Sequence, residues 1–356
     1  MGAGRSYHSR VISTDVIIVG AGPIGLEVAA AFKRIRVDYL QLDAKQIGFT
    51  VSWFTPQTRF FSSNDRIAIA GVPLQTVDQS KCTREEYLAY LRTVALLFDL
   101  KVRTYEPVVG IERVGGGFVL TTQATDGEQR YRCRRLVLAT GGTAQPRRLN
   151  IPGEDLPHVT HRLDDPHTYF RRRVLIVGGK NSAIEAALRC HHAGAHVSLS
   201  YRRPALEARS VKYWLLPEIN GLIDSRKMPA YFGAVPVEIT ASHVKLGDWS
   251  GGRASEGLRA VEAEAVLLMT GYVADMRLCK LAGVELKGEC ELPTYDARTM
   301  ETNVPGVYLA GTVTGGTQDK YTVFIENGHI HVDRIVAAIT GAPPPVTPEG
   351  EKAPES

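Results

Sequence analysis

Short apolar runs rich in β-branched residues recur along the chain and are separated by amphipathic stretches. The runs at residues 15–19 and 173–177 each lead into a glycine-rich loop, which an Ala-containing helical stretch and a second apolar run then follow. Runs without polar alternation are typical of parallel strands that are buried on both faces. Because the order strand, loop, helix, strand occurs twice, the pattern predicts an α/β fold with two Rossmann-like units.

The first of these units has the spacing of a dinucleotide-binding loop. Its loop reads GxGxxG and consists of Gly20, Ala21, Gly22, Pro23, Ile24 and Gly25. Gly20 permits a tight turn, Gly22 lets the backbone approach a pyrophosphate, and Gly25 lets the helix pack closely on the strand. The start of the helix would offer amide groups to the phosphates. Asp43 ends the next run, at the position of a carboxylate that binds ribose hydroxyls.

The second unit differs from the first in its loop and in the end of its second strand. The loop consists of Gly178, Gly179, Lys180, Asn181, Ser182 and Ala183, so a lysine stands where the second glycine is expected. Instead of an acid, Arg202 and Arg203 follow the next run. An acid favours a free 2′-hydroxyl, whereas arginines favour a 2′-phosphate. We therefore predict NADPH at this unit, with solvent-facing arginines as the alternative.

Composition narrows the class of protein further. The 356 residues are 44% hydrophobic and 22% charged with a net charge of +4, as expected for a globular chain of about two domains. Basic clusters directly precede apolar runs and have no interleaved aromatic residues, so we expect no nucleic-acid partner. Apolar runs long enough to span a bilayer are absent from the sequence, and we expect no membrane partner.

The cysteines and the chain ends give further predictions about metal binding, location and tails. Five cysteines show neither CxxC nor metal-ligand spacing, which predicts no metal site, mostly buried thiols and a cytoplasmic location. We expect tails at residues 1–13 and 342–356, and the first six residues fit an N-myristoylation pattern.

Later segments resemble the thioredoxin-reductase-like class of flavoproteins with two dinucleotide-binding domains. They are LATGG at 138–142, VLLMTGY at 266–272 and VPGVYLAG at 304–311. The resemblance implies an FAD domain at 14–165 and 274–341 that is split by an NADPH domain at 166–273. It also implies a homo-oligomer and a final helix, from about residue 321, beneath the flavin. The additional cofactor-binding residues that it implies are Thr140, Gly141, Gly271, Gly311, Thr312, Thr322 and Val323.

Four segments also resemble the bacillithiol disulfide reductase (YpdA-type) branch of this class. They are RFFSS at 59–63, GGKNSA at 178–183, VKYWLLP at 211–217 and FIENG at 324–328, within a resemblance over about residues 14–340. Two positions depart from the pattern. Thr312 stands where the wider class usually has Asp, and Ile24 stands where these reductases typically carry Cys.

These observations predict an NADPH-dependent FAD oxidoreductase, and the resemblance implies a small-molecule disulfide as the acceptor. The alternative enzyme passes electrons to a quinone, a ferredoxin or another small redox protein without redox-active cysteines, which Ile24 favours. A nucleotide-sensing flavoprotein module is the non-enzymatic alternative. His329 and His331 lie on the predicted final helix, where surface or core positions are favoured over a proton-donor role. The sequence assigns no catalytic residue and leaves the physiological acceptor open.

Overall fold

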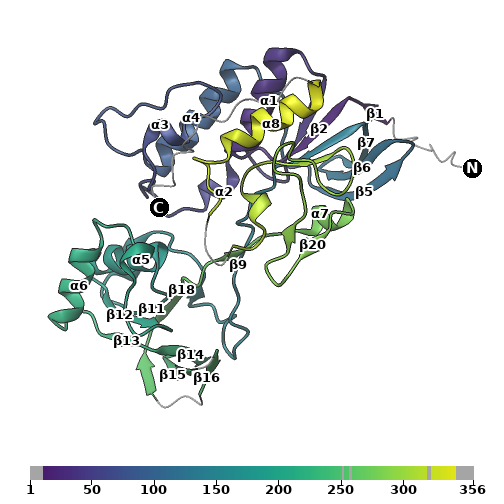
Figure 1. Ribbon diagram of the computed structural model, residues 1–356. Helices are drawn as coiled ribbons and strands as arrows, with labels where there is room; N and C mark the ends of the chain where they lie inside the picture. The colour runs from purple at the N-terminus through teal and green to yellow at the C-terminus, as the bar shows by residue number, and fades with distance from the viewer. Residues whose placement is uncertain (1–10, 251, 256–258, 319–321, 342–356) are drawn as a thin grey trace, which may run out of the picture. The chain divides into compact units, whose positions relative to one another are not determined.

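The computed structural model describes residues 11–250, 252–255, 259–318 and 322–341 and divides the chain into two compact units (Figure 1). The described part of the first unit comprises 11–52, 62–145 and 273–341, and that of the second comprises 53–61 and 146–272, apart from the gaps named above. Residues 53–61 and 146–165 were predicted from the sequence to lie in the first domain, but by their contacts they group with the second unit. The predicted myristoylation pattern and the tail at 342–356 lie outside the described residues.

A five-stranded parallel sheet forms the centre of the first unit. Its strands run in the order β22-β8-β2-β3-β4, with bounds Val307–Leu309, Arg135–Leu138, Val16–Val19, Tyr39–Leu42 and Val102–Arg103. Side chains of one face, among them Ile17, Leu136 and Leu309, are buried in a core shared with a second sheet. Helices cover the other face, so the central strands are apolar on both sides.

The second sheet of this unit has the order β1-β7-β6-β5, with bounds Ile12–Ser13, Gly127–Cys133, Gly117–Ala124 and Val108–Val114. Ile12 pairs with Tyr131, so the prediction of a tail over residues 1–13 is wrong at its end. The reason is that Ile12 packs against the buried apolar core. The helices of the unit are α1 Pro23–Ile35, α2 Phe49–Ser52, α3 Asn64–Ile67, α4 Arg84–Leu97, α7 Arg277–Leu281 and α8 His329–Thr340. Helix α8, drawn yellow, packs beside α1, drawn purple (Figure 1).

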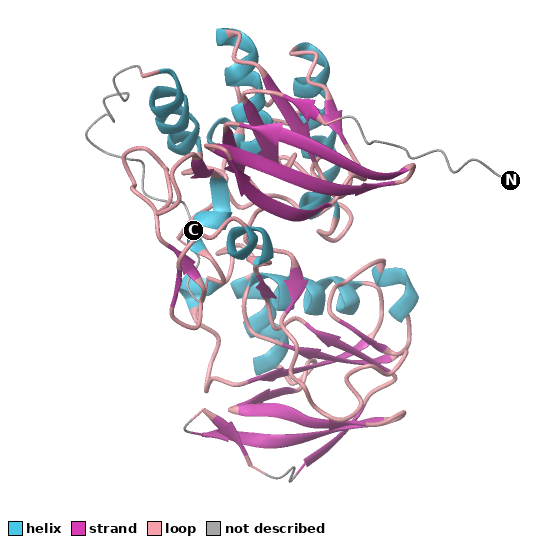
Figure 2. Cartoon of the chain, turned by 90° about the vertical axis from the view of Figure 1, so that its right-hand side faces the viewer, coloured by secondary structure: helices cyan, strands magenta, loops and turns pink. Residues whose placement is uncertain are grey.

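The second unit also contains a five-stranded parallel sheet. Its order is β10-β18-β11-β12-β13, with bounds Val159–Thr160, Ala265–Leu268, Arg173–Val177, His196–Tyr201 and Ala230–Phe232. One face packs against α5 Asn181–His192 and α6 Leu216–Asp224. The other packs against antiparallel strands, magenta in Figure 2, with bounds Ala234–Ile239 (β14), His243–Ser250 (β15), Arg253–Ala254 (β16) and Arg259–Glu262 (β17).

Short elements complete the chain. The remaining strands are β9 Gln145–Pro146, β19 Tyr272–Val273, β20 Leu286–Lys287 and β21 Leu292–Pro293, and the 3-10 helices are η1 Pro166–Tyr169, η2 Ala208–Ser210 and η3 Gly311–Gly315. Strands β9 and β19 pair with each other where the chain passes from one unit to the other and back. Two parallel sheets, the first interrupted in sequence by the second, confirm the predicted fold class.

Candidate functional site

The predicted FAD-binding residues of the first unit gather at one edge of its parallel sheet. The glycine loop follows β2, Asp43 follows β3, Thr140 and Gly141 follow β8, and Gly311 and Thr312 follow β22. Because these strands are parallel, their carboxyl ends all lie on the same side. Ligands of open α/β sheets bind outside this edge.

The glycine loop has the close packing and the open space that a pyrophosphate needs. Gly20 has a φ of +116°, and a Cβ there would lie 2.3 Å from the carbonyl oxygen of Ala139. A Cβ on Gly25 would lie 2.2 Å from the carbonyl oxygen of Gly20, so both positions require glycine. At Gly22 a Cβ would meet no atom within 4 Å, which leaves room above the loop. Pro23 begins α1, and no side chain caps this helix, so its first-turn amides remain for an anion.

Asp43 lies beside this loop. Its Oδ2 accepts a hydrogen bond from the Ala21 amide at 2.6 Å, and its Oδ1 accepts one from the Lys45 amide at 2.7 Å. Burial raises the pKa of the Asp43 carboxyl above its usual value, although these two hydrogen bonds act in the opposite direction. Each carboxylate oxygen retains a further acceptor position, so the group can still receive ribose hydroxyls while it orients the loop.

Thr312 occupies the position at which the thioredoxin-reductase-like class of flavoproteins usually has Asp. Its Oγ1 accepts a hydrogen bond from the Gly142 amide at 2.9 Å, which joins the ends of β8 and β22. The hydroxyl hydrogen remains to be donated, so Thr312 can bind a polar group at this edge without a negative charge.

The predicted start of the final helix is wrong. Helix α8 begins at His329, and Thr322 and Val323 lie in an irregular segment before it. The amides of both residues donate to the side-chain oxygen of Gln318, at 2.8 and 3.0 Å. Asn327 also bonds this segment, since its Oδ1 accepts from the Phe324 amide. These side-chain bonds compete with helical ones and delay the helix.

In the second unit, the predicted NADPH-binding residues again follow the carboxyl ends of parallel strands. The loop from Gly178 to Ala183 follows β11, Arg202 and Arg203 follow β12, and Gly271 follows β18. A Cβ on Gly179 would lie 2.5 Å from the ring of Tyr201, so this glycine permits close contact with β12.

Charged and polar side chains flank this second loop. Exposed Lys180 precedes α5, and the side-chain oxygen of Asn181 accepts from the Lys212 amide at 2.6 Å; Ser182 is exposed in the first turn. Arg202 is exposed, whereas Arg203 forms an ion pair with Glu207. Arginines and the loop therefore lie at one sheet edge, as binding of a nucleotide 2′-phosphate requires.

Two further polar residues contribute to the first edge: Gln41 was missed from the sequence, and His331 was considered there only as a surface or core residue or a proton donor. Gln41 is fully buried in β3 and donates from Nε2 to the carbonyl oxygen of Gly20 at 2.9 Å. His331 is buried on α8, and its Nδ1 accepts from the Gly311 amide at 3.0 Å. A polar residue within the apolar run of β3 was a signal for Gln41, since a buried amide needs partners.

The cysteines lie outside the glycine loop in the sequence, and most of their side chains are buried. Four of the five cysteines are buried, as expected, and Cys290 is half-buried. Burial raises the pKa of Cys133, Cys190 and Cys279 to about 12 in each case, so these thiols resist ionisation. Ile24 is buried, and Cβ atoms on Gly311 and Gly328 would lie 3.1 and 2.9 Å from its side chain. The side chain of Ile24 thus fills the space between the loop and α8.

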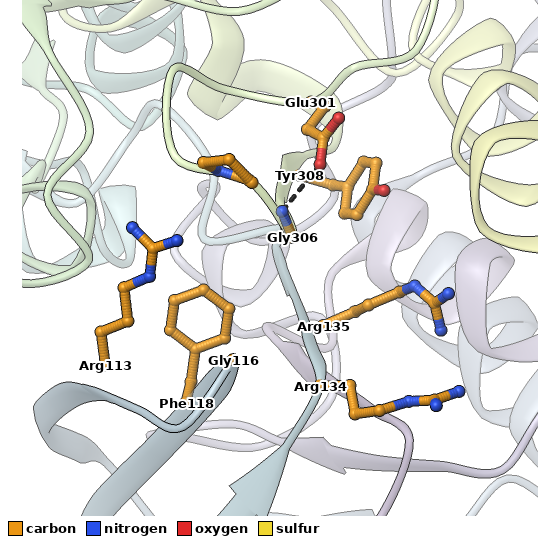
Figure 3. Close-up of a pocket in the computed structure, with 9 residues that line it drawn as sticks. Arg113, Gly116, Phe118, Arg134, Arg135, Glu301, Gly306 and Tyr308 are labelled. Carbon is orange, nitrogen blue, oxygen red and sulfur yellow. Dashed lines mark hydrogen bonds between the residues drawn. The ribbon is translucent and has the colours of Figure 1, made fainter.

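A cavity of about 340 Å³ lies at the opposite edge of the first unit's sheet (Figure 3). It is near the amino ends of β8 and β22, and Arg113, Arg134, Arg135, Glu301 and Tyr308 contribute to its lining. Figure 3 shows Arg113 on one side of Gly306, with the other two arginines extending away on the other. The guanidinium groups do not converge, and the cavity is separate from the predicted cofactor site.

Comparison with known families identifies the class of protein. The model of the pyridine nucleotide-disulphide oxidoreductase family matches residues 17–311. The chain belongs to this family. It is therefore an oxidoreductase, which decides between an enzyme and a nucleotide-sensing module in favour of the enzyme. In the described part of the chain, the helices are too short or too polar to cross a membrane.

Individual relatives agree with the predicted resemblance. The chain is 32% identical to the bacilliredoxin reductase Bdr of Bacillus subtilis over 330 residues. This alignment covers 92% of this chain and 98% of that protein. The bacillithiol disulfide reductase Bdr (YpdA) of Staphylococcus aureus aligns with a TM-score of 0.84 and 34% identity over 93% of this chain and 99% of that one. A ferredoxin–NADP reductase of Ignicoccus hospitalis is 28% identical over 84% of this chain and 90% of its own length. The predicted relationship to bacillithiol disulfide reductases is confirmed.

Proposed function

We propose that this protein uses NADPH and FAD to reduce a low-molecular-weight disulfide of the bacillithiol disulfide type. The observation that carries the proposal is the presence of two glycine loops, each at the carboxyl edge of its own parallel sheet. The chain that contains them is similar to Bdr over nearly its full length. FAD would bind the first edge and NADPH the second. The cytoplasmic location and the homo-oligomer remain predictions.

The chain's own residues would bind and orient the two cofactors. Asp43 would hold the ribose of FAD, the first-turn amides of α1 would bind the pyrophosphate, and Thr312 would donate its hydroxyl to the chain that carries the flavin. Arg202 and Arg203 would select NADPH by its 2′-phosphate. FAD, when bound, would supply two-electron redox chemistry between NADPH and the acceptor; a disulfide that receives two electrons and two protons becomes two thiols.

The absence of a loop thiol favours a second candidate acceptor. Ile24 offers no nucleophilic atom, so a mixed disulfide cannot form at this position. In this second candidate, the electrons pass to a quinone or to a small redox protein such as a ferredoxin. The similarity to a ferredoxin–NADP reductase is consistent with this route.

An acceptor screen on the purified protein tests both candidates. NADPH consumption would be followed with bacillithiol disulfide, glutathione disulfide, a quinone, a ferredoxin and dioxygen as separate acceptors. Turnover with bacillithiol disulfide well above the rate with dioxygen supports the first candidate, and turnover only with the quinone or ferredoxin supports the second. A colourless protein that neither takes up FAD nor oxidises NADPH with any acceptor would refute both.

A further inference from the structure

His331 connects the final helix to the segment that is proposed to hold the flavin. The residue lies in the first turn of α8, and only 7% of it is exposed. Its Nδ1 accepts a hydrogen bond of 3.0 Å from the amide of Gly311, which is itself buried at the end of β22. An amide can only donate, so Nδ1 carries no proton and the ring is neutral.

A small displacement of Gly311 would disturb the residues that are proposed to bind FAD at the carboxyl edge of the first unit's sheet. Its φ of +75° suits glycine, and a Cβ there would lie 3.1 Å from Ile24 of the glycine loop. The next residue, Thr312, is bonded through Oγ1 to the Gly142 amide at 2.9 Å. The carbonyl oxygen of Gly311 accepts from the Thr314 hydroxyl at 2.8 Å, so with the bond to His331 both backbone polar groups of this residue have a partner.

We propose that neutral His331 is a positioning residue for FAD, because it fixes the Gly311 amide and thereby holds Thr312 and the glycine loop in their binding geometry. This inference rests on the proposed binding of FAD at the first edge. Protonation would place an N–H group opposite the Gly311 N–H group, and two donors cannot bond each other. Acid should therefore displace Gly311 and release FAD.

The charges around His331 are consistent with a neutral ring. Burial, followed by the positive charges of Arg334 and His329 on the same helix, lowers the pKa of His331 to about 4. Helix α1 packs along α8 and also carries charged groups. Its Glu27 is hydrogen-bonded to His329, and its Lys33 and Arg34 lie in the last turn of α1. The glycine loop and residues 311–315 contain no titratable side chains, but Asp43 accepts from the loop amide of Ala21, and burial raises the pKa of its carboxyl.

Two substitutions distinguish two roles of the His331 side chain: accepting the hydrogen bond from Gly311 and filling space in the core. His331→Leu keeps a side chain of similar branching but removes the acceptor. His331→Asn is the matched control, because its Oδ1 lies as many bonds from the backbone as Nδ1 and does not titrate. FAD retention would be measured on the proteins as purified, from the free flavin that passes an ultrafiltration membrane after dilution. The visible spectrum and midpoint potential of the bound flavin would be recorded alongside.

At pH 7 we expect His331→Leu to release FAD about 10- to 100-fold more readily than the wild type, since an unsatisfied buried amide is costly. His331→Asn should stay within about threefold of the wild type, with a similar flavin potential. Between pH 5 and 4 the wild type should lose FAD more steeply than His331→Asn, because protonation of Asp43, whose pKa is also raised, affects both proteins alike. Thermal unfolding with excess FAD checks that each variant is folded.

Several outcomes would overturn the inference. His331→Leu that folds and holds FAD as tightly as the wild type, with an unchanged flavin potential, would exclude a positioning role. A loss of FAD from His331→Asn that is as steep over this acid range as that of the wild type would exclude His331 as a group that titrates there. If the wild type does not bind FAD at all, the proposed function fails first, and the result is distinguishable from the other two.

Discussion

Replacing Asp43 by Asn should weaken both FAD binding and the fold of the loop beneath it. The carboxylate accepts from the amides of Ala21 and Lys45 at 2.6 and 2.7 Å. An Asn side chain has one acceptor oxygen, so its NH₂ group would oppose one of these donors. A charge-assisted hydrogen bond of this kind contributes ~1.5–3 kcal/mol, and we expect the free energy of unfolding to fall by about that amount.

The loss of FAD affinity is expected to be about 10- to 100-fold, because a ribose hydroxyl would lose a charged acceptor of similar strength. Bound and free FAD would be measured by equilibrium dialysis, and unfolding by thermal denaturation with and without added FAD. Asp38→Asn is a matched control. Asp38 accepts from the Thr14 hydroxyl and the Asp15 amide at 3.0 and 3.3 Å, but it precedes β3 and so lies at the opposite edge of the sheet.

The control should lose some stability and keep the FAD affinity of the wild type. The reasoning is refuted if Asp43→Asn loses stability but binds FAD as the wild type does. Equal loss of FAD from Asp38→Asn would also refute it, because the effect would then come from the sheet as a whole.

Three further predictions concern NADPH selection, pH and the loop thiol. Arg202→Ala/Arg203→Ala should lose about tenfold or more of the preference for NADPH over NADH in stopped-flow flavin reduction, and equal use of both by the wild type would contradict this. Burial opposes protonation of His329, but the hydrogen bond and the negative charge of Glu27 raise the pKa of His329 above 6.5. Protonated His329 therefore stabilises the fold below pH 6.5, and this stabilisation is lost as the pH rises through the raised pKa. Glu27→Gln should flatten this decline in melting temperature above pH 6.5, and an unchanged profile would contradict it. Ile24→Cys should cost about 1–2 kcal/mol of stability through lost packing, and a gain of bacillithiol disulfide turnover would support the proposed geometry of the loop.

The glycine loops and the residues at the strand ends were accessible from the sequence because local chemistry decides them. Gly20 and Gly25 have neighbours that admit no Cβ, and such positions leave a fixed spacing in the sequence. Asp43, likewise, directly follows a short apolar strand. These features depend on the residues of a single βαβ unit, so the pattern of that unit is sufficient to locate them.

Features that depend on contacts distant in sequence were not accessible in the same way. The start of α8 was placed too early, because the side chains of Gln318 and Asn327 bond the backbone of the segment before His329 and hold it in a non-helical conformation. The role of His331 depends on an amide 20 residues away in the chain, on another element. No local pattern reports such a pairing.

The insertion of one unit within the other has a consequence for the order of folding during synthesis. Strand β8 ends at residue 138, but its partner β22 begins only at residue 307, and α8 follows still later. The second unit has all of its parallel strands once β18 has been made, before β22 exists. As the chain leaves the ribosome, we expect the second unit to fold while the first still exposes the unpaired edge of β8 and the uncovered side of α1. The unit whose synthesis begins first is the last to be completed, and over that interval its apolar surfaces are open to chaperones or to aggregation.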